Sequence, residues 1–317
     1  MDALVGFTGF VGSTLCRQHE FGATFNRSNI AEAAGSEFGT VVCAAAPGSM
    51  FTANHFPEQD AAATDALMEN LRPIKARQFI LISSIAVFAD FGGGDDESRR
   101  SFQTALAYGR NRRKLEEFCL QSFGRCLIVR LPALFGYGIR KNFLFDLLNP
   151  LPSLLTEARL TELADRLPAG LGQGLKAIYR HDPSTGLQVI DRAALAATGQ
   201  RPAYDAAVTA LGMSAVQFTH PESRFQYYDM TRLWTDICLS LQAGLDIIHL
   251  APEPLEAGII HEALLGRPMP ATPAKIHRED MRTRHAALWG RPGPYIATSD
   301  EVLDRLRQFH AVEREAA

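Results

Sequence analysis

The sequence lacks the long apolar run that a membrane-spanning helix needs. No stretch approaches the roughly 18 consecutive apolar residues required for such a helix. No basic segment precedes the short apolar N-terminus, as it would in a signal peptide. We therefore expect a cytoplasmic protein that does not bind membranes.

The sequence also lacks the cysteine and histidine patterns of disulfide frameworks and metal sites. Its five cysteines are scattered and include no CxxC pair, so reduced thiols are expected. Its nine histidines include no HxH or HExxH spacing, and no metal is expected. The acidic run from Asp95 to Glu97 follows three glycines, which predicts a solvated loop tip and not a metal site.

An excess of positive charge is missing as well. Lysine and arginine number 32 against 35 for aspartate and glutamate, which gives a formal net charge of −3. Because nucleic-acid sites need a concentrated positive surface, nucleic acid is not the expected partner. Hydrophobic residues at 46% and charged residues at 21% are close to the globular average, so disorder is excluded.

Short apolar runs alternate with helix-like stretches over residues 1–148, as they do in a parallel sheet. The predicted strands are Ala3–Phe7, Ala23–Asn26, Thr40–Ala44, Phe79–Ser83 and Cys126–Arg130. The predicted helices between them are Gly12–Glu20, Asp60–Leu71 and Phe102–Phe123. This order predicts an α/β fold with a doubly wound, Rossmann-like parallel sheet, whose ligands bind beyond the carboxyl ends of the strands.

The pattern changes after Asn149 and then partly returns. A stretch rich in Leu, Ala and Thr has helical spacing, and within it only Leu187–Ile190 predicts a strand. Farther on, the sequence predicts a helix at Tyr228–Ala243, a strand at Leu245–Leu250 and a helix at Ser299–Val312 with Ser299 as its N-cap.

The length of 317 residues fits two domains at about 150 residues each. We expect a dinucleotide-binding domain made of residues 1–148 and 223–252. The expected substrate lobe is smaller and discontinuous, with residues 149–222 and 253–317.

A glycine-rich turn follows the first predicted strand and opens a helix. It reads Gly6-Phe-Thr-Gly9-Phe-Val-Gly12, and glycines there allow a tight turn and a close approach of the backbone to a pyrophosphate. The alternative is a glycine-rich turn without a ligand. The position of the motif favours a dinucleotide site, with contacts expected from Gly6, Gly9, Phe10, Val11 and Gly12.

The end of the second predicted strand indicates which dinucleotide binds. NAD-binding folds carry an acidic residue there, whereas this chain has Asn26, Arg27 and Ser28. A guanidinium beside a hydroxyl suits a 2′-phosphate. We therefore expect NADP in preference to NAD, the alternative being that Arg27 is a solvated loop residue.

Four stretches in the first half of the chain carry a family resemblance. They are Gly6–Gly12, Ile82-Ser-Ser-Ile-Ala-Val-Phe88, Ala107-Tyr-Gly-Arg-Asn-Arg112 and Val129-Arg-Leu-Pro-Ala-Leu-Phe-Gly136. With them the chain resembles the extended short-chain dehydrogenase/reductases, the NAD(P)-dependent epimerase/dehydratase group. The resemblance covers the first domain and extends thinly to Phe225–Pro254.

The resemblance implies roles for three catalytic residues. Ser84 matches the residue that hydrogen-bonds the substrate oxygen, and Ser83 is expected to turn into the fold. Tyr108 matches the general acid/base. Arg112 stands where the family has a lysine that binds the nicotinamide ribose, and as a cation on the same helix face it is expected to do that work. The alternative places Tyr108 on a charged surface helix whose residues 110–114 pair with Glu116 and Glu117.

Further contacts are expected around the cofactor and the substrate. Ala44, Ala45, Pro132 and Leu134 are expected to contact the cofactor. Asn142 is the expected substrate ligand, with Arg140 and Lys141 as partners for an anion or as solvated basic residues. Gln226 is expected in the wall of the substrate pocket, with ordinary packing as the alternative for its segment.

These features together favour an NADP-dependent oxidoreductase. It would act on a secondary alcohol or ketone of a polar, sugar-like molecule, such as a nucleotide sugar. One alternative is a redox-neutral epimerase or dehydratase with tightly bound NAD(P), and the other is a non-catalytic dinucleotide-sensing protein. Apolar residues on more than one side of the Phe102–Phe123 helix, together with the resemblance, predict a homodimer.

Overall fold

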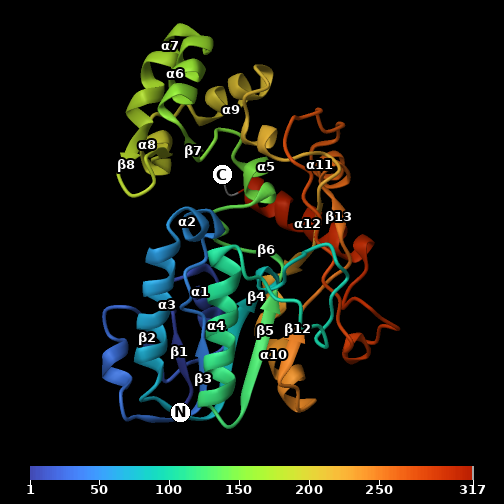
Figure 1. The fold of residues 1–317 in the computed structure, drawn as a ribbon. Helices are drawn as coiled ribbons and strands as arrows, with labels where there is room; N and C mark the ends of the chain where they lie inside the picture. The colour runs from blue at the N-terminus through green and yellow to red at the C-terminus, as the bar shows by residue number, and fades with distance from the viewer. Residues whose placement is uncertain (316–317) are drawn as a thin grey trace. The chain divides into compact units, whose positions relative to one another are not determined.

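The computed structural model describes residues 1–315 and divides into two compact units (Figure 1). Unit 1 consists of Met1–Ile139, Arg224–Leu255 and Arg278–Phe309. Unit 2 consists of Arg140–Ser223, Glu256–His277 and the chain from His310 on. Each unit has its own core and is described by itself.

Unit 1 is built on a six-stranded, fully parallel sheet. The spatial order of its strands is β12-β5-β4-β3-β1-β2. The strands are β1 (Ala3–Val5), β2 (Ala23–Phe25), β3 (Glu37–Cys43), β4 (Lys75–Ser84), β5 (Cys126–Leu131) and β12 (Ile247–His249). The predicted α/β class with a doubly wound parallel sheet is confirmed. The strand order reverses between β1 and β3, where ligands of such sheets bind.

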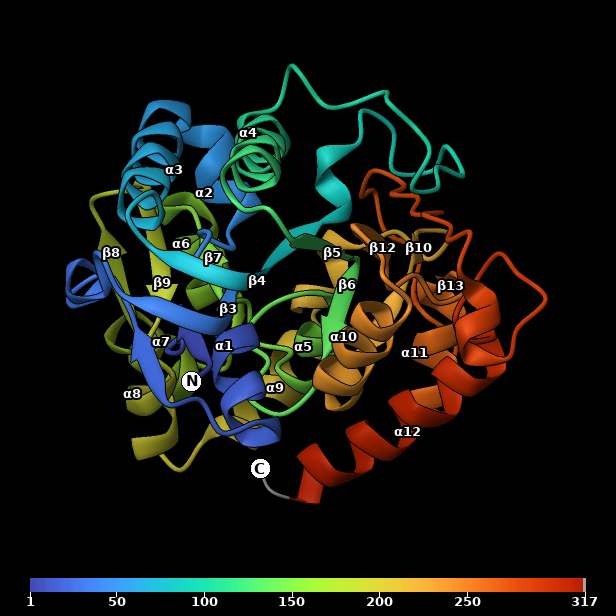
Figure 2. The same ribbon diagram turned by 90° about the horizontal axis from the view of Figure 1, so that it is seen from below.

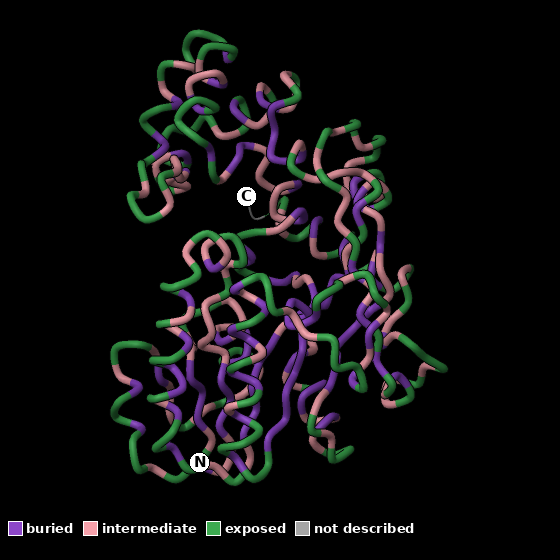
Figure 3. The backbone as a smooth tube through the Cα atoms, viewed as in Figure 1, coloured by how far each residue is buried: buried purple, intermediate pink, exposed green. Residues whose placement is uncertain are grey.

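Helices cover both faces of this sheet (Figure 2). Apolar residues of α3 and α4 pack on one face, and those of α1 and α10 pack on the other. Because both faces are covered, the central strands are buried runs, such as Phe79–Ile82 in β4 (Figure 3). The helices of this unit are α1 (Phe10–Gln18), α2 (Met50–His55), α3 (Pro57–Leu71), α4 (Ala107–Ser122), α10 (Leu233–Gln242) and α12 (Ser299–Glu315), the last of which continues beyond the unit.

Unit 2 has a small antiparallel sheet in the order β7-β9-β8. Its strands are β7 (Leu154–Leu155), β8 (Tyr179–Asp182) and β9 (Leu187–Ile190). Its helices are α5 (Phe143–Leu148), α6 (Glu157–Arg166), α7 (Ala169–Leu175), α8 (Arg192–Ala197), α9 (Arg201–Ala210) and α11 (Ala257–Leu265). Leucines spaced along α6, such as Leu160 and Leu163, fill a separate core with Tyr204 and Val208 of α9.

Short two-stranded sheets complete the fold. In one, β6 (Ala133–Phe135) pairs in parallel with β11 (Tyr227–Asp229). In the other, β10 (Arg224–Phe225) pairs with β13 (Leu255–Glu256). The first of these sheets follows directly from β5, so it continues the edge of the main sheet where a cofactor is expected.

Several predicted elements differ from the structure. The helix expected at Phe102–Phe123 begins only at Ala107, because Phe102 forms a bridge with Phe88 instead. The helix expected from Tyr228 begins at Leu233, since Tyr228 belongs to β11 and its hydroxyl donates to buried Asp236 (2.7 Å). The sequence pattern also misses β7 and β8, which are short and whose exposed residues carry no alternation.

The acidic run Asp95–Glu97 is not the solvated tip that its composition predicts. Asp95 and Glu97 are both buried. One Glu97 carboxylate oxygen accepts from the His249 amide (2.9 Å) and the Thr283 hydroxyl (2.6 Å), and the other accepts from the Arg284 amide (2.9 Å). Glu97 therefore ties the segment around residue 283 to β12 within unit 1.

The last helix begins as predicted at Ser299, but Ser299 is not its cap. The Thr298 amide donates to the Glu301 carboxylate (3.0 Å), and the Thr298 hydroxyl accepts from the Glu301 amide (3.4 Å). This is the reciprocal arrangement of a capping box. None of the helices within residues 1–315 is both long and apolar enough to cross a membrane.

Candidate active site

The glycine-rich turn lies at the carboxyl end of β1, beside the end of β3. Gly6 has φ of +93°, and a Cβ on it would lie 2.7 Å from backbone atoms of Ala44 and Ala45. A Cβ on Gly12 would lie 2.1 Å from the Gly6 carbonyl oxygen. Only glycine therefore fits at these two positions, and the turn is closed tightly against the start of α1.

Gly9, the middle glycine of the motif, differs from Gly6 and Gly12. A Cβ on Gly9 would meet only the Gly6 carbonyl oxygen, at 3.6 Å, and Gly9 is exposed. Gly9 is the N-cap of α1, and no side chain caps the helix. The first-turn amides of α1, from Phe10 and Val11 on, therefore lie behind an open backbone surface. This arrangement fits the pyrophosphate of a dinucleotide.

The end of β2 lies next to this turn, because the Gly6 amide donates to the Phe25 carbonyl (2.7 Å). Asn26 Oδ1 accepts from both the amide (2.8 Å) and the hydroxyl (2.6 Å) of Ser28, which folds the segment into a tight turn. The Ser28 hydroxyl is thus already committed to Asn26. Arg27 is exposed and forms no ion pair within residues 1–315, so its guanidinium is left for a ligand.

The two serines at the end of β4 point to different environments. The Ser83 hydroxyl donates to buried Glu116 (2.6 Å), which also binds Arg130 (2.7 Å). The expectation that Ser83 turns into the fold is confirmed. Ser84 is half-buried, and its hydroxyl accepts from the Ala86 amide (3.2 Å), so its proton is left for another acceptor.

Tyr108 stands in the first turn of α4, which packs on the short 3₁₀ turn Ile85–Val87 after Ser84. The neighbouring Gly109 makes this packing possible, since a Cβ there would lie 2.0 Å from the Ala86 carbonyl oxygen. The Asn54 side chain of α2 accepts from the Tyr108 amide (3.0 Å) and fixes the start of the helix. Sequence reasoning missed both Gly109 and Asn54, although a glycine beside the tyrosine was a visible signal.

Arg112 does not face outward as a ribose ligand would. It is 3% exposed, and its guanidinium donates to Asp60 Oδ1 (3.3 Å), to Thr64 Oγ1 (3.5 Å) and to the Pro47 carbonyl. In this structure the guanidinium is therefore engaged by protein groups, and the ribose contact implied by the family lysine stays a prediction. The pairing considered as the alternative is formed by Arg113, which binds buried Glu116 and exposed Glu117 at 3.0 Å each.

Of the other residues expected to contact the cofactor or the substrate, Pro132 and Leu134 lie at the end of the sheet, whereas Gln226 lies inside the fold. Pro132 is buried and Leu134 half-buried where the chain passes from β5 into β6. Gln226 is fully buried, and its amide donates to the carbonyls of Pro252 (2.6 Å) and Met281 (2.7 Å) and accepts from the Met281 amide (2.7 Å). The prediction that Gln226 binds substrate is wrong, because the fold uses its whole amide group.

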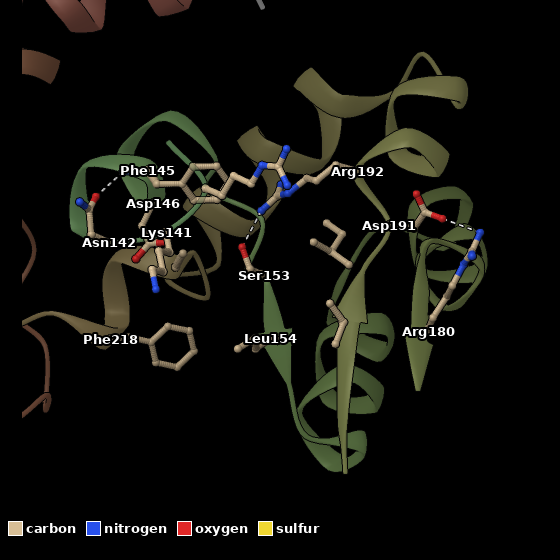
Figure 4. A pocket seen from close by; sticks show the side chains of 14 residues that line it. Lys141, Asn142, Phe145, Asp146, Ser153, Leu154, Arg180, Asp191, Arg192 and Phe218 are labelled. Atoms are coloured by element: carbon tan, nitrogen blue, oxygen red, sulfur yellow. Dashed lines mark hydrogen bonds and ion pairs between the residues drawn. The ribbon is translucent and has the colours of Figure 1, made fainter. Parts of the chain in front are cut away.

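Unit 2 contains a pocket of about 1040 Å³ between α5, the three-stranded sheet and the turn at Phe218 (Figure 4). Its lining includes Asn142, Arg140 and Lys141, the residues expected to meet the substrate. Asn142 has φ of +103° and caps α5, accepting from the Phe145 amide (3.2 Å). Four basic and two acidic side chains line the pocket, so its charge favours an anionic group.

Arg192 and Asp146 were not identified from the sequence, yet both line this pocket. Arg192 Nη2 donates to Ser153 (3.0 Å) and to the Leu151 carbonyl (3.0 Å), and the guanidinium lies 5.4 Å from the centre of the Phe145 ring (Figure 4). Its Nε and Nη1 are buried and have no hydrogen-bond partner among residues 1–315. Burial raises the pKa of the Asp146 carboxyl to about 7, while the charge of Arg192 opposes that shift.

Across the part of the chain that the structure describes, no group of three or more metal-ligating side chains comes together.

No protein-family profile and no curated protein sequence matches the chain. Solved structures do match it over its whole length. One is RMD from Pseudomonas aeruginosa complexed with NADPH, at 14% identity and a TM-score of 0.62, covering 100% of this chain and 99% of that one.

Two epimerases match to a similar extent. UDP-N-acetylglucosamine 4-epimerase from Methanobrevibacter ruminantium M1, in complex with UDP-N-acetylmuramic acid, has 11% identity and a TM-score of 0.63, covering 100% and 98% of the two chains. UDP-glucuronic acid 4-epimerase from Bacillus cereus, in a complex with NAD, has 12% identity and a TM-score of 0.61, covering 100% of both. The chain shares its fold with these proteins. At such identities the likeness concerns the fold.

Proposed function

We propose that this protein is an NADP-dependent oxidoreductase that acts on a secondary alcohol or ketone of a polar, sugar-like substrate. The observation that carries the proposal is the packing of α4 on the turn after Ser84, which brings the helix of Tyr108 to the end of β4. The glycine turn of β1 ends at the same edge of the same parallel sheet.

The roles of the two side chains follow from their chemistry. The Ser84 hydroxyl can donate to the reacting oxygen of the substrate, because its own acceptor capacity serves the Ala86 amide. The Tyr108 hydroxyl, which has no hydrogen-bond partner within residues 1–315, can move the proton to or from that oxygen. A bound nicotinamide supplies or accepts the hydride.

The pocket of unit 2 supports a polar, sugar-like substrate. The basic lining of its pocket, with exposed Phe218 at the edge, suits a molecule that carries an anionic group and an apolar or planar part. The solved structures of the same fold include complexes with UDP-sugars and with NADPH or NAD. We therefore place a nucleotide sugar or a similar phosphorylated sugar first among candidate substrates.

Tyr108→Phe tests the proposal directly. Turnover, followed by the absorbance of the reduced nicotinamide with a panel of sugar ketones and alcohols, should fall by about 10²–10⁴-fold, the usual contribution of a positioned proton donor. Affinity for NADP should change little, and Ser84→Ala should act in the same direction. Tyr295→Phe, which removes only a hydroxyl that donates to Asp280, is the matched control.

The same experiment separates the alternatives. Isomerised product without net reduction, together with cofactor retained through purification, would replace the proposal with an epimerase or dehydratase. Normal NADP binding without turnover of any sugar in the panel would replace it with a dinucleotide sensor. Full activity of Tyr108→Phe on an identified substrate would place the catalytic groups elsewhere.

A further inference from the structure

The buried cation at position 112 has a buried anion opposite it. Arg112 Nη2 lies 3.3 Å from Asp60 Oδ1, and the two side chains are 3% and 4% exposed. Asp60 belongs to α3, so this ion pair joins α3 to α4 within unit 1. A buried charge of either sign is costly without its partner, and the pair therefore holds both groups in place.

Asp60 makes a second contact with the next residue along α4. Its Oδ2 accepts from the Asn111 side-chain amide (2.8 Å), so one carboxylate binds two consecutive residues of the helix. Thr64 lies one turn along α3, and its hydroxyl donates to the Asp60 carbonyl (2.8 Å) and accepts from Arg112. The guanidinium is thus held by contacts from one side.

The other side of Arg112 meets Tyr108 and the loop after β3. Its Cζ lies 4.6 Å from the centre of the Tyr108 ring, the geometry of a cation–π contact between residues i and i+4. Its Nη2 donates to the Pro47 carbonyl, in the loop that begins with Ala44 and Ala45. Arg112 therefore joins the expected acid/base residue to the loop that contacts the glycine turn.

We propose that Asp60 is a positioning residue for Tyr108: it pins Arg112 against the tyrosine ring and, by its own charge, sets how strongly that cation favours the ionised phenol. The inference rests on the proposed function, which gives Tyr108 its role. It assigns Arg112 a fixed place against the tyrosine ring.

Two charged side chains are linked to Tyr108 by contacts in the described structure. Arg112 comes from α4 and Asp60 from α3. From α2 come the neutral Asn54 and His55, whose ring nitrogen hydrogen-bonds the Phe51 carbonyl (2.9 Å). The 3₁₀ turn Ile85–Val87 contributes apolar side chains. A change of charge at Asp60 should therefore reach Tyr108 mainly through the Arg112 pair.

The test is a pH titration of tyrosinate absorbance, in which the signal of Tyr108 is the difference between each protein and the same protein carrying Tyr108→Phe. Asp60→Asn keeps an oxygen acceptor for Arg112 and removes the opposing charge. The midpoint of Tyr108 ionisation should then fall, because the charge of Arg112 is no longer offset by a neighbouring anion. Combining Asp60→Asn with Arg112→Gln removes both charges, and the midpoint should rise above that of the wild type.

Asp65→Asn is the matched control, because Asp65 also joins α3 to α4, through an exposed ion pair with Lys114 (2.5 Å). It should leave the midpoint unchanged. The double variant buries no unpaired charge, so it keeps the test available if Asp60→Asn alone does not fold. Midpoints that stay within 0.2 pH unit of the wild type (roughly the resolution of such a titration) in both Asp60 variants would overturn the inference.

Turnover separates this inference from the proposed function. Activity lost in Tyr108→Phe, with both Asp60 variants unchanged in midpoint and in the pH dependence of kcat, would overturn the role of Asp60 alone. A shift in the pH dependence of kcat that follows the midpoint supports it. Full activity of Tyr108→Phe would overturn the proposed function and this inference with it.

Discussion

The role of the Arg112 side chain is determined by the residues that it contacts. The guanidinium serves three acceptors at once, namely Asp60, Thr64 and the Pro47 carbonyl. A lysine there has a single compact ammonium and cannot reproduce this fork, so the exchange of arginine for lysine is not conservative in this fold. The lysine that the resembled family has at this position is therefore no guide to the role of Arg112 in this protein.

Arg27 gives the clearest prediction about the cofactor. It is exposed beside the glycine turn, and Arg27→Ala should weaken NADP binding by about 1–3 kcal/mol, the range for losing a charge-assisted hydrogen bond. NAD binding should barely change, because NAD has no 2′-phosphate. Titration of both cofactors against both proteins measures the difference. Equal losses for the two cofactors would show that Arg27 does not read the phosphate.

Asp146 gives a prediction about pH. Its pKa is raised to about 7 in the folded protein against 3.8 for the free side chain, so the folded state holds the proton more tightly. Stability should therefore fall as pH rises from about 4 to 7 and then level off. Asp146→Asn should unfold like the wild type near pH 4 and be more stable at pH 8 by on the order of 2–4 kcal/mol.

Thermal unfolding at the two pH values measures this effect, with Asp165→Asn as an exposed control in α6 of the same unit. A variant no more stable than the wild type at pH 8 would show that the Asp146 carboxyl is not held in its neutral form.

Single residues also mark the limit of what could be predicted from the sequence. The inward orientation of Ser83 is predicted correctly because neighbours on a strand point to opposite faces, whereas the catalytic role of Ser84 stays a prediction. Gln226 is assigned wrongly, since its partners Pro252 and Met281 lie 26 and 55 residues away in the sequence. The residues around Gln226 give no indication of these partners. Asp60 and Asp146 were not identified for the same reason, as each acquires its role from a distant arginine.

At the scale of elements, periodicity predicted the sheet well and the connections poorly. Buried runs such as Phe79–Ile82 and the strand Leu187–Ile190 are found where they were expected. The helix containing Tyr108 was drawn too long, because Phe102 is apolar at helical spacing and yet bridges to Phe88. Asp95 and Glu97 were placed in water by composition, although the backbone amides that bury Glu97 come from residues 249 and 284.

Gly109 provides the test of element packing. Gly109→Ala would place a methyl group 2.0 Å from the Ala86 carbonyl oxygen, so α4 has to move away from the turn after Ser84. We expect a loss of about 1–3 kcal/mol in the free energy of unfolding, as for other overpacked sites, and a fall in turnover. Gly124→Ala is the control, because a Cβ there meets nothing within 4 Å.

Denaturant unfolding of both variants measures the difference. If Gly109→Ala were as stable and active as the wild type, the close approach of α4 to the Ser84 turn would be wrong.

At the scale of the whole molecule, a homodimer through α4 stays a prediction. Leu115 and Cys119, two of the apolar residues on which it was based, are in the core. Leu106 at 46% and Leu120 at 36% exposure are left on the surface, about four helical turns apart and so on one side.

Light scattering at micromolar concentration should give a dimer for the wild type and a monomer for the double variant Leu106→Glu, Leu120→Glu. Val312→Glu on α12 serves as the control. A monomeric wild type would contradict the prediction.

The interrupted course of unit 1 has a consequence for how the chain is made. β5 ends at Leu131, but its neighbour β12 begins only at Ile247, and the chain of unit 2 lies between them. At a synthesis rate of about 5–20 residues per second, the ribosome needs roughly 6–25 s to deliver that neighbour. During this interval β5 is the open edge of a growing apolar sheet and a template for pairing with another nascent chain. A fragment that stops at Ser223 would keep that edge open for good, whereas the finished protein closes it with the last strand of the sheet to be synthesised.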